Sequence, residues 1–332
     1  MGAPRFSVIV PVYNRRDEIT DLCESLLAQT DKDFELVVVE DGSTDPCSDI
    51  VEDFATRGLN ARYFYKDNEG RSIARNYGME HARGSYFVFF DSDCVIPPAY
   101  FATVKAELAT DCYGGPDAAH ESFTDTQKAI NYAMTAFLTT GGIRGGRIQL
   151  EKFVPRTFNM GYSREVYERV GGFREMFSED IDMSTRIRQA GFSIALLRDA
   201  AVWHKRRVDF RKFLRQVYVF GMSRITLKLL YPDSLKLVHT LPALFVIGCA
   251  LSILLASFVS PWWLLPLGLY FAAIFAGALV QTHSVRIAAL AMPAAAIQLG
   301  GYGVGFIRAY VSKILLRRGR NVAEEVAIRK GK

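Results

Sequence analysis

The sequence predicts a mostly parallel α/β domain, then a basic amphipathic helix, then helices that cross a membrane. Three observations support this prediction. Short apolar runs alternate with helical patterns through residues 1–204, a cluster of Lys and Arg follows, and the 49 residues from Leu237 to Val285 contain no Lys, Arg, Asp or Glu. The chain is 50% hydrophobic and 23% charged. A disordered chain needs low hydrophobicity and high charge, so that class is excluded.

Residues 1–204 are expected to form one domain. Its predicted strands are Phe6–Val10, Phe34–Val39, Tyr63–Tyr65 and Tyr86–Phe90. Its predicted helices are Asp17–Gln29, Cys47–Arg57, Arg71–His81 and Pro98–Leu108. Alternation of this kind predicts a mostly parallel sheet. Ligands of such sheets bind beyond the carboxyl ends of the strands, so the residues that follow each strand are the first candidates for chemistry.

Polar residues follow the first two predicted strands. Pro11, Tyr13 and Asn14 come after the first strand, and Asn14 suits either a nucleotide contact or a helix cap. Glu40 and Asp41 end the second strand. Carboxylates in this position can accept hydrogen bonds from a base or from ribose hydroxyls, although the following Gly and Ser also favour an ordinary turn.

Two carboxylates leave the fourth predicted strand at spacing i, i+2. Asp91 and Asp93 follow the apolar run Tyr86–Phe90, which is expected to be central and buried. Both can reach one hard cation, and oxygen ligands suit Mg²⁺ or Mn²⁺ held against a diphosphate. An acidic turn is the alternative. The chain has no GxxxxGK and no GxGxxG between a strand and a helix, which argues against P-loop and dinucleotide-binding proteins.

Two predicted helix starts carry charge. Arg71 and Arg75 lie one turn apart at the start of a helix and can meet a diphosphate together with the helix N-terminus. Glu179 and Asp180 begin another helical stretch. The helix macrodipole alone favours acids there, and a general base is the functional alternative.

Residues 205–236 are basic. Eight Lys and Arg and one Asp occur from Lys205 to Lys228. An apolar helical face is formed by residues at spacing i, i+3, i+4, i+7, namely Phe210, Phe213, Leu214 and Val217. This pattern predicts an interfacial amphipathic helix on anionic lipid, where each cation contributes about 1 kcal/mol. Nucleic-acid binding is not expected, because no recognition motif accompanies the charge.

Residues 237–316 are predicted to be the membrane region. Two spans are expected at about 237–258 and 262–281, because a crossing needs roughly 20 apolar residues. Trp262 and Trp263 suit a membrane interface. A third, irregular segment at about 287–316 contains Pro293 and a glycine run from Gly300 to Gly305, for which close helix packing is expected. A basic tail follows at residues 317–332.

The orientation of this region follows from charge and cysteines. The basic tail favours the cytoplasmic side. The N-terminal domain is expected there too, since five cysteines without a CxxC pair indicate free thiols and no signal peptide precedes the domain. An even number of crossings satisfies both expectations. The third segment is therefore either a bent, re-entrant hairpin or a span that breaks the charge rule.

Six segments resemble family 2 glycosyltransferases of the GT-A fold, over about residues 5–205. They are VPVYN, EDGSTD, GRSIARNYG, DSD, FNMGYSREVYERVGGF and SEDIDMSTRIRQAG, in the family's order and with fitting spacing. The RQVYVFG stretch and the apolar segments resemble bacterial membrane-bound members of that family. The resemblance implies a Rossmann-like mixed, mostly parallel sheet. No QxxRW follows the SED motif, which argues against a processive synthase.

The resemblance implies a role for each matching position. The nucleoside pocket of the donor would be lined by Pro11, Tyr13, Glu40 and Asp41, and the donor diphosphate would lie near Arg71, Arg75 and Asp91. A divalent metal would be held by Asp93 and Asp91, with help from His204. Asp180 would be the general base. The acceptor side would be bordered by Asn159, Met160, Gly161 and Glu179. Glu40 stands where Asp is commoner in the family, so the identity of the base stays open.

The implied function is inverting transfer of a sugar from a UDP- or GDP-sugar to a hydroxyl group. The acceptor would be a polyprenyl-diphosphate-linked sugar or a glycolipid, in cell-surface polysaccharide assembly at the inner membrane, with the catalytic domain facing the cytoplasm. Transfer onto polyprenyl phosphate, as in relatives of dolichyl-phosphate-mannose synthase, is one alternative, but it needs no base. A catalytically silent membrane assembly subunit is another. The intact Asp91, Asp93 and Asp180 favour an enzyme.

Overall fold

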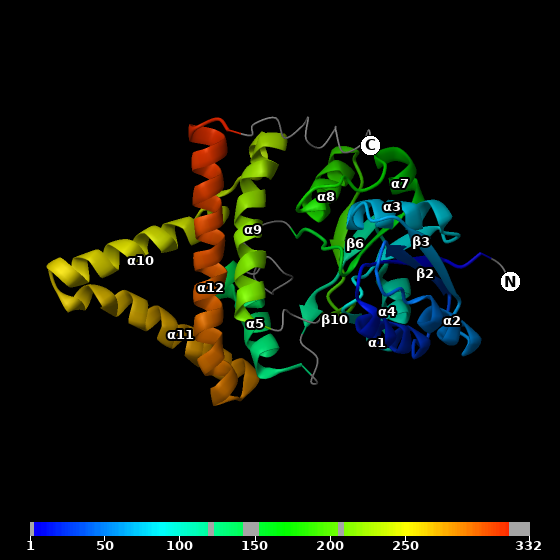
Figure 1. Ribbon diagram of the computed structural model, residues 1–332, viewed down its shortest axis with the longest axis horizontal. Helices are drawn as coiled ribbons and strands as arrows, with labels where there is room; N and C mark the ends of the chain where they lie inside the picture. The colour runs from blue at the N-terminus through cyan, green and yellow to red at the C-terminus, as the bar shows by residue number, and fades with distance from the viewer. Residues whose placement is uncertain (1–2, 119–122, 142–152, 205–208, 319–332) are drawn as a thin grey trace. The chain divides into compact units, whose positions relative to one another are not determined.

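A seven-stranded mixed sheet forms the centre of the first of two structural units (Figure 1). The computed structural model describes residues 3–118, 123–141, 153–204 and 209–318. The strand order β3-β2-β1-β4-β8-β6-β9 comprises Ala61–Lys66, Phe34–Asp41, Phe6–Val12, Tyr86–Phe89, Met160–Ser163, Cys112–Gly114 and Ile194–Leu196. All neighbouring strands are parallel except β8, which is antiparallel to both β4 and β6. The predicted mostly parallel α/β fold is confirmed.

The central strands are buried on both faces because helices cover both sides of the sheet. Side chains alternate along β1, so that Val8 and Val10 join one apolar cluster and Ile9 joins the other. The first cluster is covered by α1 (Arg16–Leu27), α2 (Ser48–Thr56) and α4 (Tyr100–Glu107). The second is covered by α3 (Arg71–His81), α7 (Arg164–Val170) and α8 (Glu179–Gln189). Near-continuous apolar strands such as β2 need this double cover.

A second, three-stranded sheet lies next to the exit of β4. It pairs β10 (Val202–His204) antiparallel with β5 (Cys94–Val95) and parallel with β7 (Asp117–Ala118). His204 lies opposite Cys94 in this register. The pairing therefore brings the end of a late strand beside the residues that follow Asp91 and Asp93.

The second unit consists of helices from two separate stretches of the chain. They are α5 (Asp125–Thr135), α6 (Phe137–Thr140), α9 (Phe210–Leu230), α10 (Leu241–Phe258), α11 (Leu265–Thr282) and α12 (Val285–Ala309). Ile130 and Met134 of α5 pack with Phe213 and Val217 of α9. The structure therefore differs from the predicted single domain over residues 1–204, because the apolar face of α5 is buried against late helices.

Three helical segments in the described chain are long and apolar enough to cross a membrane. They are Leu241–Phe258, Pro261–Thr282 and Val285–Leu315. The first two match the predicted spans closely. The third was expected to be irregular, yet it is one continuous helix through Pro293 that ends in a π-helical turn, Tyr310–Leu315.

The basic stretch before these segments forms α9, as its periodicity predicts. Its apolar face is covered by protein, because Phe213 and Val217 are fully buried against α5 and α12. The prediction that this whole face lies on lipid was therefore wrong for these two residues. Only Leu214 of that set is exposed.

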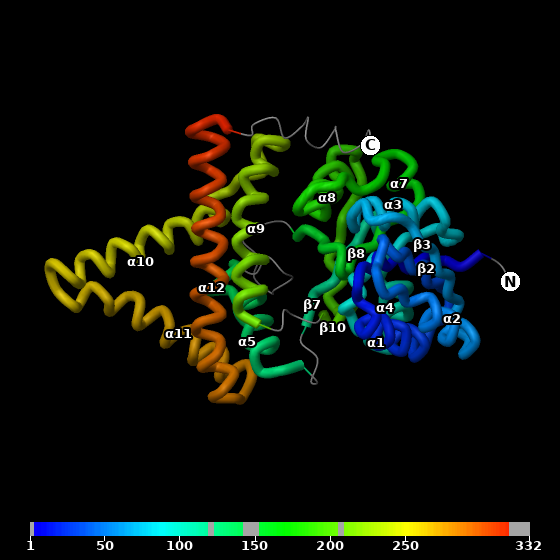
Figure 2. The backbone as a smooth tube through the Cα atoms, viewed as in Figure 1, coloured from blue at the N-terminus to red at the C-terminus, as the bar shows by residue number. Residues whose placement is uncertain are grey.

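Glycines of α12 allow its neighbours to approach closely, as expected from the sequence. A Cβ atom at Gly305 would lie 2.1 Å from the carbonyl oxygen of Tyr218 in α9, and one at Gly301 would lie 2.6 Å from Val217. Figure 2 shows α12 beside α9 along much of its length. The small-residue pattern thus serves backbone contact between helices.

We expect Phe101→Ala to lower the free energy of unfolding of the first unit by about 3–5 kcal/mol, as large-to-small core changes do. The ring is fully buried, stacks on Phe34 at 4.5 Å and lies 5.5 Å from Phe6. Urea unfolding of the detergent-solubilised chain, followed by near-UV circular dichroism, measures the change. Tyr65→Ala is the control, because Tyr65 is exposed. Equal midpoints for the two variants would contradict the packing described here.

Candidate active site

The turns after β1 and β2 are joined through Asn14. Its backbone N–H donates to Ser43 Oγ at 2.7 Å, and its Oδ1 accepts from Thr44 N at 2.9 Å. Asn14 has φ of 51°, a left-handed conformation that Asn tolerates better than most residues. Pro11 is half-buried beside these turns, whereas the Tyr13 ring is exposed. Tyr13 can therefore contact a ligand, and Asn14 shapes the loop.

Glu40 is enclosed by the turn that follows β2. It is fully buried, and its carboxylate accepts from Ser43 Oγ, from Cys47 N at 2.9 Å and from Tyr63 OH at 3.4 Å. A buried carboxylate is stable only when it is hydrogen-bonded. The structure places Glu40 as a support of the turn, and its contact with a nucleoside stays a prediction.

Asp41 organises the segment that leads into α3. Its carboxylate accepts from Lys66 Nζ at 3.0 Å, from Glu69 N at 3.0 Å and from Gly70 N at 2.9 Å. Gly70 has φ of 104°, and a Cβ there would lie 2.8 Å from the carboxylate of Glu175. Only glycine fits this position without strain. Asp41 and Gly70 together set the start of α3 and hence the placement of its arginines.

The two arginines of α3 meet acids from two other elements. Arg75 is 1% exposed and pairs with Glu179 Oε1 at 3.1 Å and with Asp91 Oδ1 at 2.7 Å. Arg71 pairs with Glu179 Oε2 at 2.8 Å, and half of its side chain is exposed. Sequence reasoning assigned both arginines to a diphosphate. The structure distinguishes them, because Arg75 is itself buried and engaged with two carboxylates, whereas the half-exposed Arg71 can also reach a ligand.

Asp180 is held by an arginine that sequence reasoning missed. Arg156 Nη1 lies 3.2 Å from Asp180 Oδ2, and Asp180 Oδ1 accepts from Ile181 N at 2.8 Å. The Asp180 side chain is 15% exposed, so it is partly reachable by solvent. No sequence motif marked Arg156. The pair brings the segment before β8 to the start of α8.

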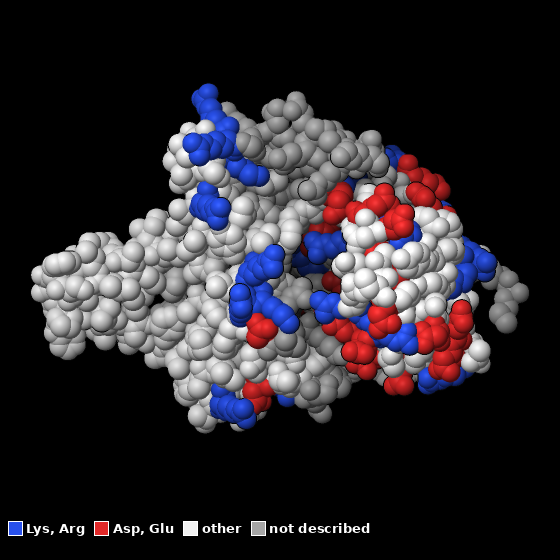
Figure 3. Space-filling view, viewed as in Figure 1, with Lys and Arg blue, Asp and Glu red and all other residues white. Residues whose placement is uncertain are grey.

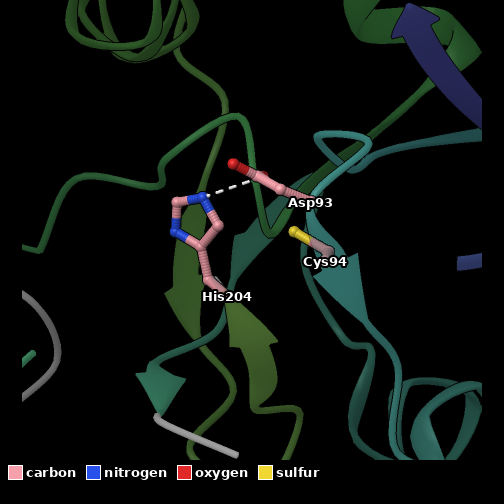
Figure 4. A group of neighbouring side chains, drawn as sticks. All are labelled: Asp93, Cys94 and His204. Atoms are coloured by element: carbon pink, nitrogen blue, oxygen red, sulfur yellow. Dashed lines mark ion pairs between the residues drawn. The ribbon is translucent and has the colours of Figure 1, made fainter. Parts of the chain in front are cut away.

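Asp93 and His204 face each other beside the second sheet (Figure 4). Asp93 Oδ1 lies 3.1 Å from His204 Nε2, and the imidazole stacks on Phe158 with ring centroids 4.6 Å apart. Ligand atoms of Asp93, Cys94 and His204 all lie within 4.8 Å of one another. The Asp93 carboxylate is an oxygen ligand of the kind that Mn²⁺ and Mg²⁺ take, and an imidazole is a common ligand of transition-metal ions. Asp91 does not join this group, since it pairs with Arg75.

Cys94 is a packed thiol. Complete burial raises the pKa of its thiol well above the ordinary value, and the negative charges of Asp93 and Asp91 raise it further. A protonated, enclosed thiol is a poor nucleophile and a poor metal ligand. The donor set for a cation is therefore Asp93 with His204.

Glu18 of α1 is a second acid beside Asp93 that the sequence did not mark. Its carboxylate accepts from Ser92 Oγ at 3.3 Å. Burial raises the pKa of Glu18, and the charge of Asp93 raises it further, while Arg15 opposes both effects. Glu18 thus supports the loop that carries Asp91 and Asp93.

The predicted acceptor-side residues on β8 are parts of the core. Asn159 is fully buried, accepts from Tyr100 OH at 2.6 Å and donates to the carbonyl oxygen of Ala200 at 2.7 Å. Met160 is also fully buried, and a Cβ at Gly161 would lie 2.4 Å from the Tyr113 ring. These residues pack against other core residues, and their place at an acceptor border stays a prediction. Glu179, also expected there, holds the two arginines.

Comparisons with known proteins agree with the fold. Residues 7–171 match the Glycosyl transferase family 2. The uncharacterized glycosyltransferase EpsJ of Bacillus subtilis is 30% identical over 204 residues, which cover 59% of this chain and 57% of EpsJ. Glycosyltransferase AglE of Haloferax volcanii is 26% identical over 250 residues, which cover 74% of this chain and 81% of AglE.

One solved structure matches most of the chain in fold. It is the mannosyltransferase PcManGT from Pyrobaculum calidifontis in complex with GDP-Man and Mn²⁺, with a TM-score of 0.53, 21% identity and coverage of 95% of this chain and 88% of that chain. Several curated relatives are longer, and the chain spans between 15% and 57% of the first ones that it matches.

We expect Glu179→Ala to lower the free energy of unfolding by about 3–5 kcal/mol, since it leaves the buried Arg75 guanidinium with one partner fewer. Both side chains of the pair are at most 2% exposed. Thermal and urea unfolding of the solubilised chain measure the loss. The control is Glu165→Ala, whose exposed pair with Arg169 should change stability by less than about 1 kcal/mol. If Glu179→Ala left the free energy of unfolding unchanged, the pair of Arg75 with Glu179 would not organise the site.

Proposed function

The chain carries a family 2 glycosyltransferase domain of the GT-A fold, and from this premise we propose that it transfers a sugar from a nucleotide-sugar donor to a hydroxyl group of a membrane-anchored acceptor. The observation that carries the proposal is the meeting of acids and arginines from four elements in one unit. Asp91 follows β4, Arg71 and Arg75 begin α3, Glu179 and Asp180 begin α8, and Arg156 precedes β8.

In the proposed reaction, Asp180 accepts the proton of the acceptor hydroxyl while its oxygen attacks the anomeric carbon of the donor sugar. The bond to the nucleotide diphosphate breaks on the opposite face, so the configuration inverts. Arg156 pairs with the Asp180 carboxylate and orients it in the free protein. The arginine must release one carboxylate oxygen when the acceptor arrives, because general-base catalysis requires direct hydrogen-bond reach to the proton.

Arg71 is the cation best placed for the donor diphosphate. Half of its side chain is exposed, and a guanidinium binds phosphate oxygens in pairs. Asp93 and His204 would hold a divalent cation such as Mn²⁺ or Mg²⁺, which would neutralise charge on the leaving diphosphate. The GDP-mannose and Mn²⁺ of the solved mannosyltransferase are consistent with a GDP- or UDP-sugar donor here.

The acceptor is proposed to be a polyprenyl-diphosphate-linked sugar or a glycolipid, used in cell-surface polysaccharide assembly. Three long apolar helices support membrane association. A hydroxyl acceptor is favoured over polyprenyl phosphate because a phosphate acceptor would leave Asp180 without a proton to remove. Location at the inner membrane, with the catalytic domain in the cytoplasm, belongs to the same proposal and fits the free thiols.

We expect Asp180→Asn to reduce turnover by about 100- to 10,000-fold, as loss of a general base does. Donor affinity should be unchanged, because Asp180 acts on the acceptor. Nucleotide release with a panel of nucleotide sugars and lipid acceptors measures turnover, and calorimetry measures donor binding. Asp53→Asn is the control, since Asp53 is exposed on α2. Normal turnover of Asp180→Asn with polyprenyl phosphate alone would favour direct transfer onto that lipid.

We expect Asp93→Ala to abolish the dependence of donor binding on Mn²⁺. The wild-type chain should bind its donor more tightly as Mn²⁺ is added, and a chelator should reverse this. Isothermal titration at several metal concentrations compares the two proteins, with Asp53→Ala as the matched loss of an exposed acid. An unchanged metal titration in Asp93→Ala would remove Asp93 from the metal site. Absence of donor binding by the folded wild-type chain would favour a silent assembly subunit.

A further inference from the structure

The three candidate membrane helices differ in how much of their surface other helices cover. Only 6% of the apolar window of Leu241–Phe258 and 11% of that of Pro261–Thr282 is buried, against 50% for Val285–Leu315. The third segment is flanked by α5 and α9 and contacts α10 and α11. All three segments are therefore candidate membrane spans by length and composition, but other helices cover the third far more than the first two.

The helix α12 has charged side chains beside it near both ends. Arg286, in its first turn, pairs with Asp125 of α5 at 3.1 Å. Arg308, in its last turn, donates to Tyr218 OH of α9 at 2.8 Å, and Lys313 donates to Thr226 Oγ1 at 3.0 Å. A membrane span can carry charges at its ends, so these contacts alone do not exclude a crossing.

The residues beside the middle of α12 indicate whether this helix can cross a membrane. Gly300 lies fifteen residues from each end of the segment 285–315. A groove of about 1000 Å³ runs between this part of α12 and the first half of α9. Its apolar floor is formed by Leu214, Gly300, Gly301 and Val304. Its remaining lining is polar and mostly cationic, and consists of Asp209, Arg211, Lys212, Arg215 and Tyr218.

The groove lining carries three cations and one carboxylate, so its positive charge exceeds its negative charge. Asp209 caps α9 through Lys212 N at 2.7 Å and lies 3.7 Å from Lys212 Nζ. Arg211 and Arg215 are exposed, and the described part of the chain offers neither a carboxylate within ion-pair distance. If α12 crossed a membrane, these cations would lie near the middle of the hydrocarbon layer, where charge is strongly disfavoured. Long cationic side chains reach the interface by snorkelling when they lie near the end of a membrane span, not beside its middle.

The hairpin of α10 and α11 has the opposite character. No Lys, Arg, Asp or Glu occurs from Leu237 to Val285, and Figure 3 shows no such residue over this hairpin. Exposed apolar side chains lie on both helices, among them Ile247, Leu251 and Leu269. Within its unit the hairpin points away from α9 and α12 (Figure 1). Its segments of 18 and 22 residues are about 27 and 33 Å long, near the roughly 30 Å of a hydrocarbon layer.

The tip of the hairpin suits a membrane interface. Ser260 and Pro261 make the turn, and Trp262 and Trp263 follow with exposed side chains. Tryptophan prefers the level of the lipid headgroups, because its ring is apolar and its N–H is polar.

We propose that, of the three candidate segments, only the α10–α11 hairpin crosses the membrane, whereas α9 and α12 lie along its surface and present the groove cations to the phosphates of acidic lipids. Both ends of α12 then lie on one side of the membrane, and the tip of the hairpin lies on the other. Two crossings return the chain to the side from which it entered. The proposal is independent of the catalytic one, since it concerns lipid contacts alone.

Cysteine labelling of the full chain tests the crossings. The variants Val285→Cys, Leu316→Cys and Val259→Cys place a thiol at exposed positions at the start of α12, just beyond its end and at the hairpin tip. Cys249→Ala is the background, because the other four native cysteines are buried in the first unit. A membrane-impermeant maleimide is applied to right-side-out and inverted vesicles of the expressing bacterium.

The labelling outcomes separate the topologies. We expect Val285→Cys and Leu316→Cys to react from the same side and Val259→Cys to react from the opposite side. Reaction of Val285→Cys and Leu316→Cys from opposite sides would show that α12 crosses, and would overturn the proposal. If Val259→Cys reacted from the same side as Val285→Cys, or from neither side, the hairpin would not cross the membrane. Either result would overturn the proposal.

A lipid titration tests the groove. In nanodiscs of phosphatidylcholine with rising phosphatidylglycerol, we expect the thermal midpoint of the wild-type chain to rise, and Arg211→Gln with Arg215→Gln to lose most of that rise. Arg57→Gln with Arg169→Gln is the matched control, because it removes two exposed cations of the first unit. The assignment of acidic lipid to this groove would be overturned if phosphatidylglycerol raised the thermal midpoint of the groove variant as much as that of the wild-type chain. It would also be overturned if the control variant lost as much of the rise as the groove variant does.

Discussion

The first unit depends on one buried guanidinium, that of Arg75. An arginine cannot lose its charge to fit an apolar interior, so its burial requires carboxylates in fixed positions. Glu179 at the start of α8 and Asp91 after β4 supply them. The start of α8 is therefore held to α3 and to the exit of β4, about a hundred residues earlier in the chain, by a single charge. Arg71, Asp93 and Asp180, which are proposed for chemistry, belong to these same segments, so their mutual placement follows from this constraint.

The polar residues around this centre fall into two groups. Glu40, Asp41 and Asn159 form hydrogen bonds with other parts of the protein. Glu40 supports the turn after β2, Asp41 fixes the start of α3, and Asn159 joins the start of β8 to its neighbours. Arg71, Asp93 and Asp180 keep part of their surface open. A resemblance between motifs does not separate the two groups, because residues of both groups occur in the same short segments. Burial and hydrogen-bond partners do separate them.

The second unit is organised around α12, with glycines that bring α9 and α10 against its backbone. Charge is distributed unevenly over this unit. The helices α5, α9 and α12 carry it, and the α10–α11 hairpin has none. Such a division fits a unit in which one layer meets polar surroundings and one hairpin meets lipid, because a bilayer separates charged from apolar surface more strictly than water does.

The sequence by itself determined the α/β class and the alternation of the first four helices with the strands β1 to β4. It also determined the long uncharged region and the membership of Asp91, Asp93 and Asp180 in recognisable motifs. These properties depend on local patterns, namely periodicity, turn residues and runs without charge. Only the tertiary structure decided that α5 packs with the late helices, that Arg156 holds Asp180, that Glu40 and Asn159 are enclosed, and that the face of Phe213 and Val217 is covered by protein. Each of these is a contact between residues that are distant in the chain. Which distant residues meet is decided by packing and by the need to pair buried charge. A local sequence pattern contains no information about either.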